Sequence, residues 1–319
     1  MTLAKLILTV DEAEKDRNKW LALRNTGIGG SDAGVIMGMN PWKSRYHLWL
    51  EKTGKVQPED ISQKDSVHFG TVLEPVVARE FEARSGKTVR RCGTLQHPHE
   101  PWMLANVDRL VVGEDAGLEI KTTNAFSAGD WDADKLPDSY YWQCQHYMMV
   151  TGLPAWYIAV LIGGNDYRCK MIPRHDADID ALYKAERAFW TVHVLQDIPP
   201  EIDGSEATTE ALKEQYPGGE TEPLELPPPA GVILGLYDIY KTQEKEAKAK
   251  VQEAQNLLMS MMGDCEIATF AGRKVTWKTR AGSTTIDRKK LQAEYRDAFE
   301  ACKKVGKPSR VFKVYEKEE

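Results

Sequence analysis

Cysteine is scarce in this chain of 319 residues, and long apolar runs are absent. The five cysteines are odd in number, and no two of them are near neighbours in the sequence. This spacing argues against a disulfide framework, a zinc ribbon and a cysteine-ligated iron–sulfur cluster. No apolar run approaches the ~20 residues that a membrane-spanning helix needs. Residues 1–10 lack the pattern of a cleaved signal peptide, so we expect a cytoplasmic protein without membrane contacts.

Positive charge is also in short supply over most of the chain, whose formal net charge is −6. Residues 1–230 carry 24 Lys and Arg against 35 Asp and Glu, whereas residues 231–319 carry 18 against 13. The negative net charge of the whole chain argues against nucleic acid as a partner. Because the two segments differ in sign, however, the mean charge does not describe a local binding surface.

The chain does have enough apolar residues, 42% of the total, to form a packed core. Its length suggests one large domain and a smaller one. Residues 198–230 contain seven prolines and eight acidic residues against one lysine, which is typical of a linker. We therefore expect a core over residues 1–197, a proline-rich acidic linker over 198–230 and a basic extension over 231–319.

Hydrophobic periodicity and turn residues predict an α/β or α+β domain with one mixed sheet flanked by helices. The predicted helices cover residues 9–24, 31–36, 45–52, 72–84, 136–150 and 176–195, with Ser31 capping the second of them. The predicted strands cover residues 88–92, 102–112, 117–122, 155–162 and 167–172.

The remaining elements belong to the linker and to the basic extension. They are a helical stretch near 208–215, a helix over 232–262, a hairpin over 266–278, a helix over 288–303 and a strand over 310–315. The extension could bind DNA, be a solvated surface or contact another protein, and the sequence leaves these interpretations open.

The strongest chemical signal is an aspartate followed by a Glu-x-Lys pattern on the next predicted strand. Asp108 lies within an apolar stretch, and Glu119 and Lys121 alternate along residues 117–122. Because side chains alternate along a strand, Glu119 and Lys121 share a face while Ile120 points into apolar packing. Two carboxylates and one lysine can thus meet on two adjacent strands.

Paired carboxylates of this kind suit hard divalent cations such as Mg²⁺ or Mn²⁺. Such a cation activates water and stabilises charge on a phosphate, and a neighbouring lysine can act on that water. The alternative is a cross-strand ion pair on the surface, because a pattern this short often arises by chance. The apolar surroundings favour the metal site, since an unpaired buried charge is costly.

Several blocks of residues together resemble the YqaJ-type viral recombinases, phage nucleases related to lambda exonuclease within the PD-(D/E)XK superfamily. The blocks lie at residues 20–24, 27–33, 69–75, 106–108, 118–121, 140–148 and 155–159. The resemblance implies a PD-(D/E)XK core in which Asp108, Glu119 and the Ile120 backbone carbonyl hold Mg²⁺. Lys121 would act on the attacking water. The family's proline before the aspartate is replaced here by Val107.

The same resemblance implies roles for four further residues. Glu74 would lie near a second metal ion, Gln143 would support the site, and Arg24 and Ser31 would hold a DNA 5′-phosphate. Each has a plainer interpretation. Glu74 could be an ordinary helix acid, Gln143 a solvent-facing residue, Arg24 a residue favoured by the helix dipole and Ser31 an N-cap.

The function implied by the resemblance is a Mg²⁺-dependent exonuclease of phage recombination. It would digest linear duplex DNA from a 5′ end in the bacterial host cell and leave a 3′ single strand for an annealing protein. Lambda-type relatives form a ring, so a homo-oligomer is expected. Two alternatives are an endonuclease on the same core and a catalytically silent protein that binds DNA or a partner.

Overall fold

The computed structural model describes residues 4–57, 64–132, 134–220, 222–306 and 309–315. The chain divides into two compact units, Met1–Pro217 and Gly218–Glu319, and the division falls inside the segment expected as a linker. No helix within the described ranges combines the length and the apolar character needed to cross a bilayer. The two units are described separately below.

The first unit is built on a five-stranded mixed sheet with the strand order β2-β5-β6-β7-β8. Only the central pair β6–β7 is parallel, and the other pairs are antiparallel. The strands are β2 (Val89–Arg91), β5 (Arg109–Val111), β6 (Ala116–Thr123), β7 (Ala155–Ile162) and β8 (Asp166–Pro173). A second sheet has the order β1-β3-β4, with β1 (Lys5–Leu8), β3 (Thr94–Gln96) and β4 (Leu104–Asn106).

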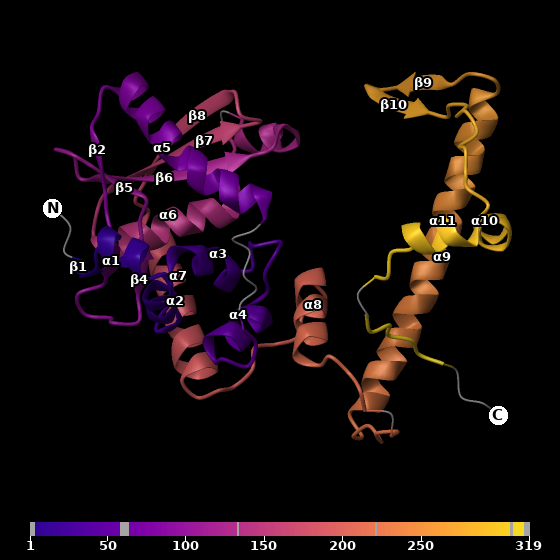
Figure 1. Cartoon of the computed structure of the whole chain (residues 1–319), viewed down its shortest axis with the longest axis horizontal. Helices are drawn as coiled ribbons and strands as arrows, with labels where there is room; N and C mark the ends of the chain where they lie inside the picture. The colour runs from indigo at the N-terminus through magenta and orange to yellow at the C-terminus, as the bar shows by residue number, and fades with distance from the viewer. Residues whose placement is uncertain (1–3, 58–63, 133, 221, 307–308, 316–319) are drawn as a thin grey trace. The chain divides into compact units, whose positions relative to one another are not determined.

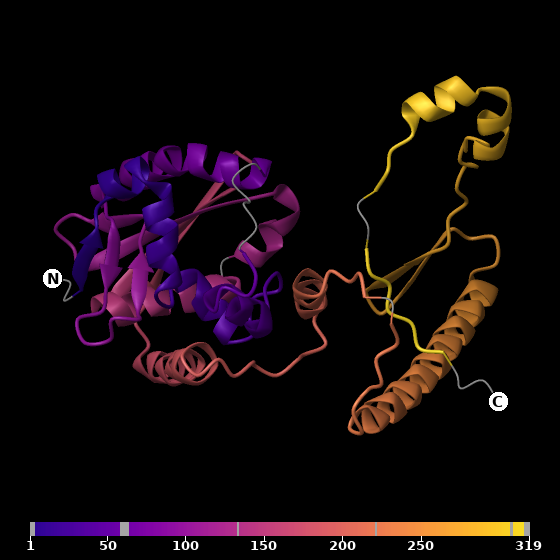
Figure 2. The same cartoon turned by 60° about the horizontal axis from the view of Figure 1, so that its bottom comes forward.

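Helices cover both faces of the larger sheet, as Figures 1 and 2 show. On one face, α5 (Asp65–Ser85) packs Val77 and Phe81 against Leu118 and Ile120 of β6. On the other face, the buried side chains of α6 (Asp138–Thr151) pack against β7. The expected mixed sheet flanked by helices is therefore confirmed.

The smaller helices of this unit are α1 (Val10–Lys15), α2 (Arg17–Asn25), α3 (Gly30–Ile36), α4 (Arg45–Lys52) and α7 (Asp176–Ala188). Of these, α3 and α7 pack against α6. A 3₁₀-helical segment, Ala125–Trp131, follows β6. The buried face of α3 packs on α6 and brings the glycine-rich segment close to that helix, with no room for a Cβ atom at Gly30 beside Tyr147.

Two expected elements are interrupted. The predicted strand over 102–112 is wrong, because β4 and β5 belong to different sheets and the chain turns between them at Val107 and Asp108. The predicted helix over 9–24 is broken at Asp16, whose side chain accepts a hydrogen bond from the Lys19 amide and starts a new helix. The Asp16 side chain caps the start of the next helix, whereas the Asp108 side chain binds the amide of a residue on another strand.

Other helix boundaries also differ from the expectation. The helix predicted over 72–84 begins earlier, at Asp65. The helix predicted over 176–195 changes after Ala188 into a π-helical turn, Phe189–Val194. The strands β1 and β3 are too short for a periodic signal and were not predicted.

The helix α8 (Glu206–Gln215) packs against α4 and belongs to the first unit. Ala207, Thr208 and Ala211 are buried there, and the Tyr46 hydroxyl donates to the Gln215 side chain at 2.6 Å. Part of the expected linker is thus an element of the first unit.

The second unit contains the long helix α9 (Ala230–Met262) and an antiparallel hairpin of β9 (Ile267–Phe270) and β10 (Arg273–Thr276), as expected. The helix predicted over 288–303 is two short helices, α10 (Arg288–Glu294) and α11 (Arg296–Cys302). The strand predicted over 310–315 is wrong, since these residues, all of them described, form no strand.

Candidate active site

The turn after β4 brings Asp108 to the middle of β6. One Asp108 carboxylate oxygen accepts a hydrogen bond from the Ile120 amide at 2.8 Å. On the same strand, the Lys121 ammonium lies 2.6 Å from a Glu119 carboxylate oxygen. The expected shared face of Glu119 and Lys121 is confirmed, and the Ile120 side chain points to the opposite face, toward α5.

Burial and mutual repulsion dominate the electrostatics of this group. Burial raises the pKa of the Asp108 carboxyl well above its ordinary value, and the negative charge of Glu119 raises it further. Burial alone would lower the pKa of Lys121, but the charges of Glu119 and Asp108 raise it, so this lysine is a fixed cation. The Lys121 ammonium also lies 4.7 Å from the centre of the Tyr140 ring. Two carboxylates facing one lysine leave negative charge in a largely buried place.

The donor set fits a hard divalent cation. The second carboxylate oxygen of Glu119 is buried and has no hydrogen-bond partner among the described residues. A buried, unpaired carboxylate oxygen is costly unless a cation or water binds it. The described parts of the chain hold no cluster of three or more His, Cys, Asp or Glu that could form a metal cage. Two carboxylates with the Ile120 carbonyl and water match Mg²⁺, which keeps several of its waters.

Helix α6 fixes the position of Glu119. The Gln143 side-chain amide donates to a Glu119 carboxylate oxygen at 2.7 Å and to the Tyr147 hydroxyl at 2.8 Å. The Tyr147 hydroxyl in turn donates to the Asn106 carbonyl at 2.9 Å. Gln143 is therefore buried at the site and does not face solvent. Sequence reasoning missed Tyr147, although its spacing of four from Gln143 places both on one helix face.

Glu74 is not brought into this cluster as a third free carboxylate. Its carboxylate pairs with the guanidinium of Arg109, whose side chain is only 8% exposed. Glu74 and Asp108 do line the same cavity, which has a volume of about 410 Å³. Sequence analysis gave no role to Arg109, because its partner lies 35 residues away.

The cavity lies between the N-terminal helices and the strands around Asp108. The Trp20 indole donates to the Asn106 side chain at 3.1 Å and holds α2 at the edge of the cavity. Its other lining residues are Val10, Ala13, Glu14, Arg17, Arg91, Cys92, Gly93, Thr94, Val107 and Arg109.

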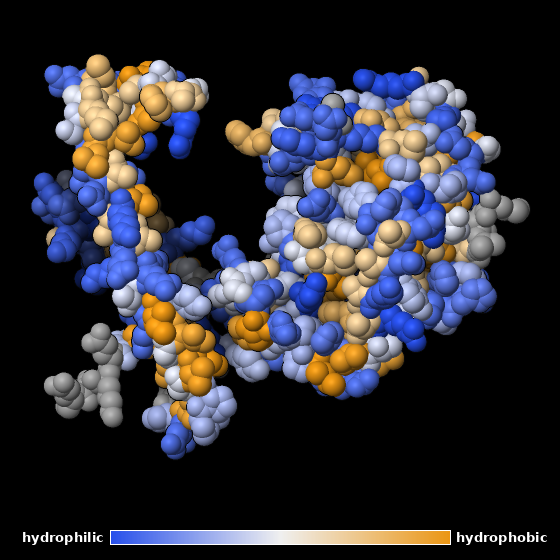
Figure 3. Space-filling model, turned by 180° about the vertical axis from the view of Figure 1, so that it is seen from behind, coloured by the Kyte–Doolittle hydropathy of each residue, from blue (hydrophilic) through white to orange (hydrophobic). Residues whose placement is uncertain are grey.

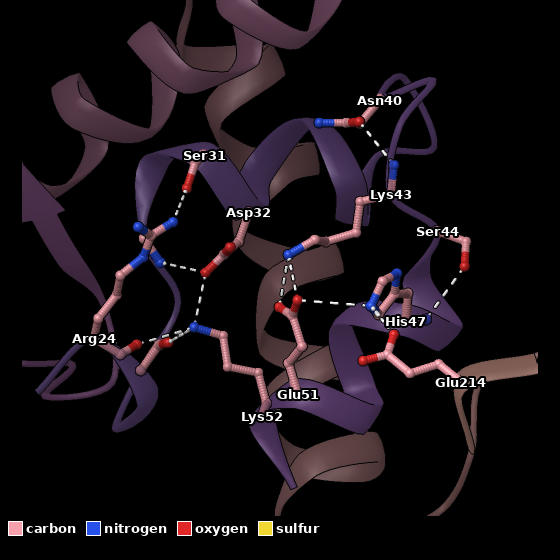
Figure 4. A network of polar contacts seen from close by, with 12 residues as sticks. Arg24, Ser31, Asp32, Asn40, Lys43, Ser44, His47, Glu51, Lys52 and Glu214 are labelled. Atoms are coloured by element: carbon pink, nitrogen blue, oxygen red, sulfur yellow. Dashed lines mark hydrogen bonds and ion pairs between the residues drawn. The ribbon is translucent and has the colours of Figure 1, made fainter. Parts of the chain in front are cut away.

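Arg24 and Ser31 lie next to each other, with the guanidinium donating to the Ser31 hydroxyl at 2.8 Å (Figure 4). The expectation that Ser31 caps its helix is wrong, because α3 starts after Gly29 and Ser31 lies in its first turn. The Asp32 carboxylate binds the Gly29 amide at 3.0 Å instead, which leaves the Ser31 hydroxyl on the surface.

A buried ion pair beneath this segment was not foreseen from the sequence. The Lys52 ammonium lies 2.9 Å from the Asp32 carboxylate and also donates to the carbonyls of Arg24 and Gly27 (Figure 4). Burial alone would raise the pKa of Asp32, but the charges of Lys52 and Arg24 and the Gly29 amide lower it to about 2. The pair thereby anchors α4 to the glycine-rich segment.

Comparison with known proteins places this chain in a family. Residues 19–154 match the model of the YqaJ-like viral recombinase domain. The "Uncharacterized protein YqaJ" of Bacillus subtilis (strain 168) is 42% identical over 311 residues, which cover 95% of this chain and 96% of that protein. This chain belongs to the YqaJ-like viral recombinase family. The resemblance seen in the sequence is confirmed.

Solved structures of exonucleases are also similar. The alkaline exonuclease LHK-Exo from Laribacter hongkongensis is 23% identical with a TM-score of 0.49, covering 56% of this chain and 93% of that chain. The structure of LHK-Exo in complex with dAMP is 25% identical to this chain, with a TM-score of 0.48. The match covers 61% of this chain and 95% of that chain.

Proposed function

We propose that this member of the YqaJ-like family is a Mg²⁺-dependent exonuclease that hydrolyses phosphodiester bonds of linear duplex DNA. It would start at a 5′ end and leave a 3′ single strand. The observation that carries the proposal is the meeting of Asp108, Glu119 and Lys121 at one point, with one buried Glu119 oxygen unpaired. A protein that only bound DNA would have no use for this costly arrangement.

Each residue has a part in the proposed reaction. Asp108, Glu119 and the Ile120 carbonyl would hold Mg²⁺, or Mn²⁺ in its place, with a second ion nearer Glu74. When bound, such ions lower the pKa of water and offset charge on the phosphate. Lys121 holds the attacking water and offsets developing negative charge. Gln143 keeps the Glu119 carboxylate oriented through its hydrogen bond.

The preference for a 5′ end would come from Arg24 and Ser31. A guanidinium beside an exposed hydroxyl offers hydrogen-bond donors suited to a terminal phosphate. Arg24→Ala should therefore reduce the ratio of cleavage rates on 5′-phosphate and 5′-hydroxyl ends. Arg84→Ala is the control, because Arg84 pairs with Glu80 on α5. An unchanged ratio in Arg24→Ala would remove Arg24 from this role.

A time course on three duplex substrates tests the proposal. Linear DNA with a 5′-phosphate, linear DNA with a 5′-hydroxyl and closed circular DNA are incubated with Mg²⁺ or with EDTA. We expect Mg²⁺-dependent loss of linear DNA only, fastest with the 5′-phosphate. Cleavage of the closed circle would instead identify an endonuclease, and no cleavage of any substrate would identify a silent binding protein.

The proposal also covers the binding partners of the protein and its location in the cell. The 3′ single strand would pass to a single-strand annealing protein, and several copies of the chain would form a ring around the duplex. Both would operate in the cytoplasm of a bacterial host cell, where a phage or prophage protein of this family recombines DNA. Pull-down with the single-strand annealing protein, with and without resected DNA, would test the first of these.

A further inference from the structure

Helix α9 carries a row of exposed side chains along one of its sides, all of them apolar except Gln243. The large members of the row are between 44% and 81% exposed. Figure 3 shows hydrophobic side chains gathered near the two ends of this unit's long helix and hydrophilic ones along its middle. The row, called the α9 stripe below, consists of Ile233, Leu236, Tyr240, Gln243, Ala247, Val251, Ala254, Leu258 and Met261. At three or four residues apart, these positions fall on one side of the helix.

The positions of the α9 stripe are spaced symmetrically about its middle residue, Ala247. Ile233 and Met261 lie 14 residues before and after Ala247, and Leu236 and Leu258 lie 11 residues from it. Two copies of the helix running antiparallel, with Ala247 against Ala247, would thus match every stripe position with another stripe position.

The side chains opposite one another in that arrangement are complementary in size. Tyr240 and Ala254 both lie seven residues from Ala247, so each ring would meet an alanine of the second copy. Leucine would meet leucine at positions 236 and 258, and alanine would meet alanine at the centre. Large side chains facing small ones can interdigitate and exclude water.

The charged residues beside the stripe occur in pairs of opposite sign at equal distances from Ala247. At equal distances from Ala247, Glu244 corresponds to Lys250, Glu246 to Lys248 and Lys241 to Glu253. At 100° per residue, Glu244 and Lys248 lie on one flank of the stripe and Glu246 and Lys250 on the other. Each acidic residue has a lysine at the mirrored position.

This symmetry favours an antiparallel pair over a parallel one. In the antiparallel pair, Glu244 lies beside Lys248 of the second copy and Glu246 beside Lys250, so four opposite-charge neighbours outnumber two like-charge ones, Lys248 with Lys248 and Glu246 with Glu246. In a parallel pair in register, Glu244 would instead lie beside Glu246 and Lys248 beside Lys250, so four like-charge neighbours would outnumber two opposite-charge ones, Glu246 with Lys248. Like charges at these flanking positions disfavour pairing.

We propose that α9 is a self-association element that pairs antiparallel with α9 of a second copy of this chain, about a twofold axis at Ala247. The contact would extend over about 40 Å of helix at 1.5 Å per residue. It would cover the exposed stripe and exchange the present intrachain Glu244–Lys248 contact for one between copies. The inference does not depend on the nuclease activity proposed above.

Cysteine cross-linking of the full chain tests the direction of the pairing. Cys169, Cys265 and Cys302 are exposed and are first replaced by serine. Ile233→Cys and Met261→Cys proteins are then oxidised separately and as a mixture. The proposal predicts disulfide-linked dimers in the mixture and none in either protein alone. Dimers from each protein alone would show parallel pairing, and no dimers in any sample would show that α9 does not self-associate. Either result would overturn the proposal.

Charge reversal tests the flanking contacts in the same full chain. Glu244→Lys with Glu246→Lys should weaken association, measured by sedimentation velocity, by about tenfold or more because lysines then face lysines. Adding Lys248→Glu and Lys250→Glu should restore it, since the pattern is only inverted. Lys245→Glu is the control, because this position is on the far side of the helix. Unchanged association in the double variant, or no recovery in the quadruple variant, contradicts the proposed contact.

Discussion

Asp108, in the turn between β4 and β5, lies close to Glu119 of β6, and this position is unfavourable for two carboxylates. Burial and the charge of Glu119 raise the pKa of Asp108, so ionised Asp108 destabilises the fold at neutral pH. A site built for a cation accepts this cost, because the cation offsets the repulsion when it binds. Stability and proposed activity should therefore change in opposite directions when Asp108 loses its charge.

Asp108→Asn tests that opposition. The amide oxygen can still accept the Ile120 hydrogen bond, but the buried negative charge is gone. We expect the melting temperature in EDTA at neutral pH to rise by a few degrees, while Mg²⁺-dependent cleavage is lost. A calorimetric scan and a nuclease assay on the same protein check both parts. A lower melting temperature in EDTA would contradict the account of repulsion at the site.

The buried pair of Asp32 and Lys52 predicts a pH dependence. The pKa of Asp32 is lowered to about 2 from an ordinary value of 3.8, so its stabilising effect is complete above pH 3.8 and is lost as the pH falls toward 2. This shift corresponds to about 2 kcal/mol. The gap in unfolding free energy between the wild type and Asp32→Asn, measured in urea, should shrink between pH 5 and pH 3. A gap that widens in this range would contradict the assignment.

Sequence patterns predicted only those parts of the site that are local. Alternation along one strand was enough to place Glu119 and Lys121 on one face. The Arg109 partner of Glu74 and the Lys52 partner of Asp32 come from distant segments. No spacing rule relates such residues, because their contact depends on how whole elements pack.

At the scale of elements, α6 joins the two halves of the site. Its Gln143 side chain donates to Glu119 on β6. Its Tyr147 hydroxyl donates to the carbonyl of Asn106, two residues before Asp108. A second contact is formed by His146, whose ring binds the Leu104 carbonyl and the buried Glu186 carboxylate at 2.8 Å each. The helix thus holds β4 and β6 at a fixed separation.

Tyr147→Phe removes one of these connections. It leaves the Asn106 carbonyl and one Gln143 N–H without a partner, which should cost about 1–3 kcal/mol of stability. Cleavage should fall on the order of tenfold or more, because Glu119 is less firmly oriented. Tyr141→Phe is the matched control, since this α6 hydroxyl donates to Asp178, away from the site. A wild-type rate in Tyr147→Phe would show that the connection has no catalytic importance.

Element boundaries were less predictable than element types. The apolar pattern over 102–112 continues through Val107, so nothing in it marks the change from one sheet to another. That change is set by the Asp108 carboxylate binding the Ile120 amide, which is a tertiary contact. The mixed sheet and its covering helices followed correctly from the order of strands and helices.

At the scale of the whole molecule, the first unit should fold without the second. A chain ending after Pro217 keeps α8 and its contacts with α4. It should melt cooperatively and retain Mg²⁺-dependent cleavage. A chain ending after Asp197 is the control, since losing α8 uncovers the buried surface around Tyr46 and should lower the melting temperature by several degrees. Equal melting temperatures for the two chains would contradict the role given to α8.

The central claim is that Asp108, Glu119 and Lys121 form a hydrolytic site for DNA. The most direct test compares the wild type, Lys121→Ala and Lys87→Ala on linear 5′-phosphorylated duplex DNA in Mg²⁺. Lys87 is a matched surface lysine that pairs with Glu114. The account predicts that Lys121→Ala loses at least about a hundredfold in cleavage rate with its fold retained by circular dichroism, while Lys87→Ala cleaves normally. Wild-type cleavage by a folded Lys121→Ala protein would contradict it.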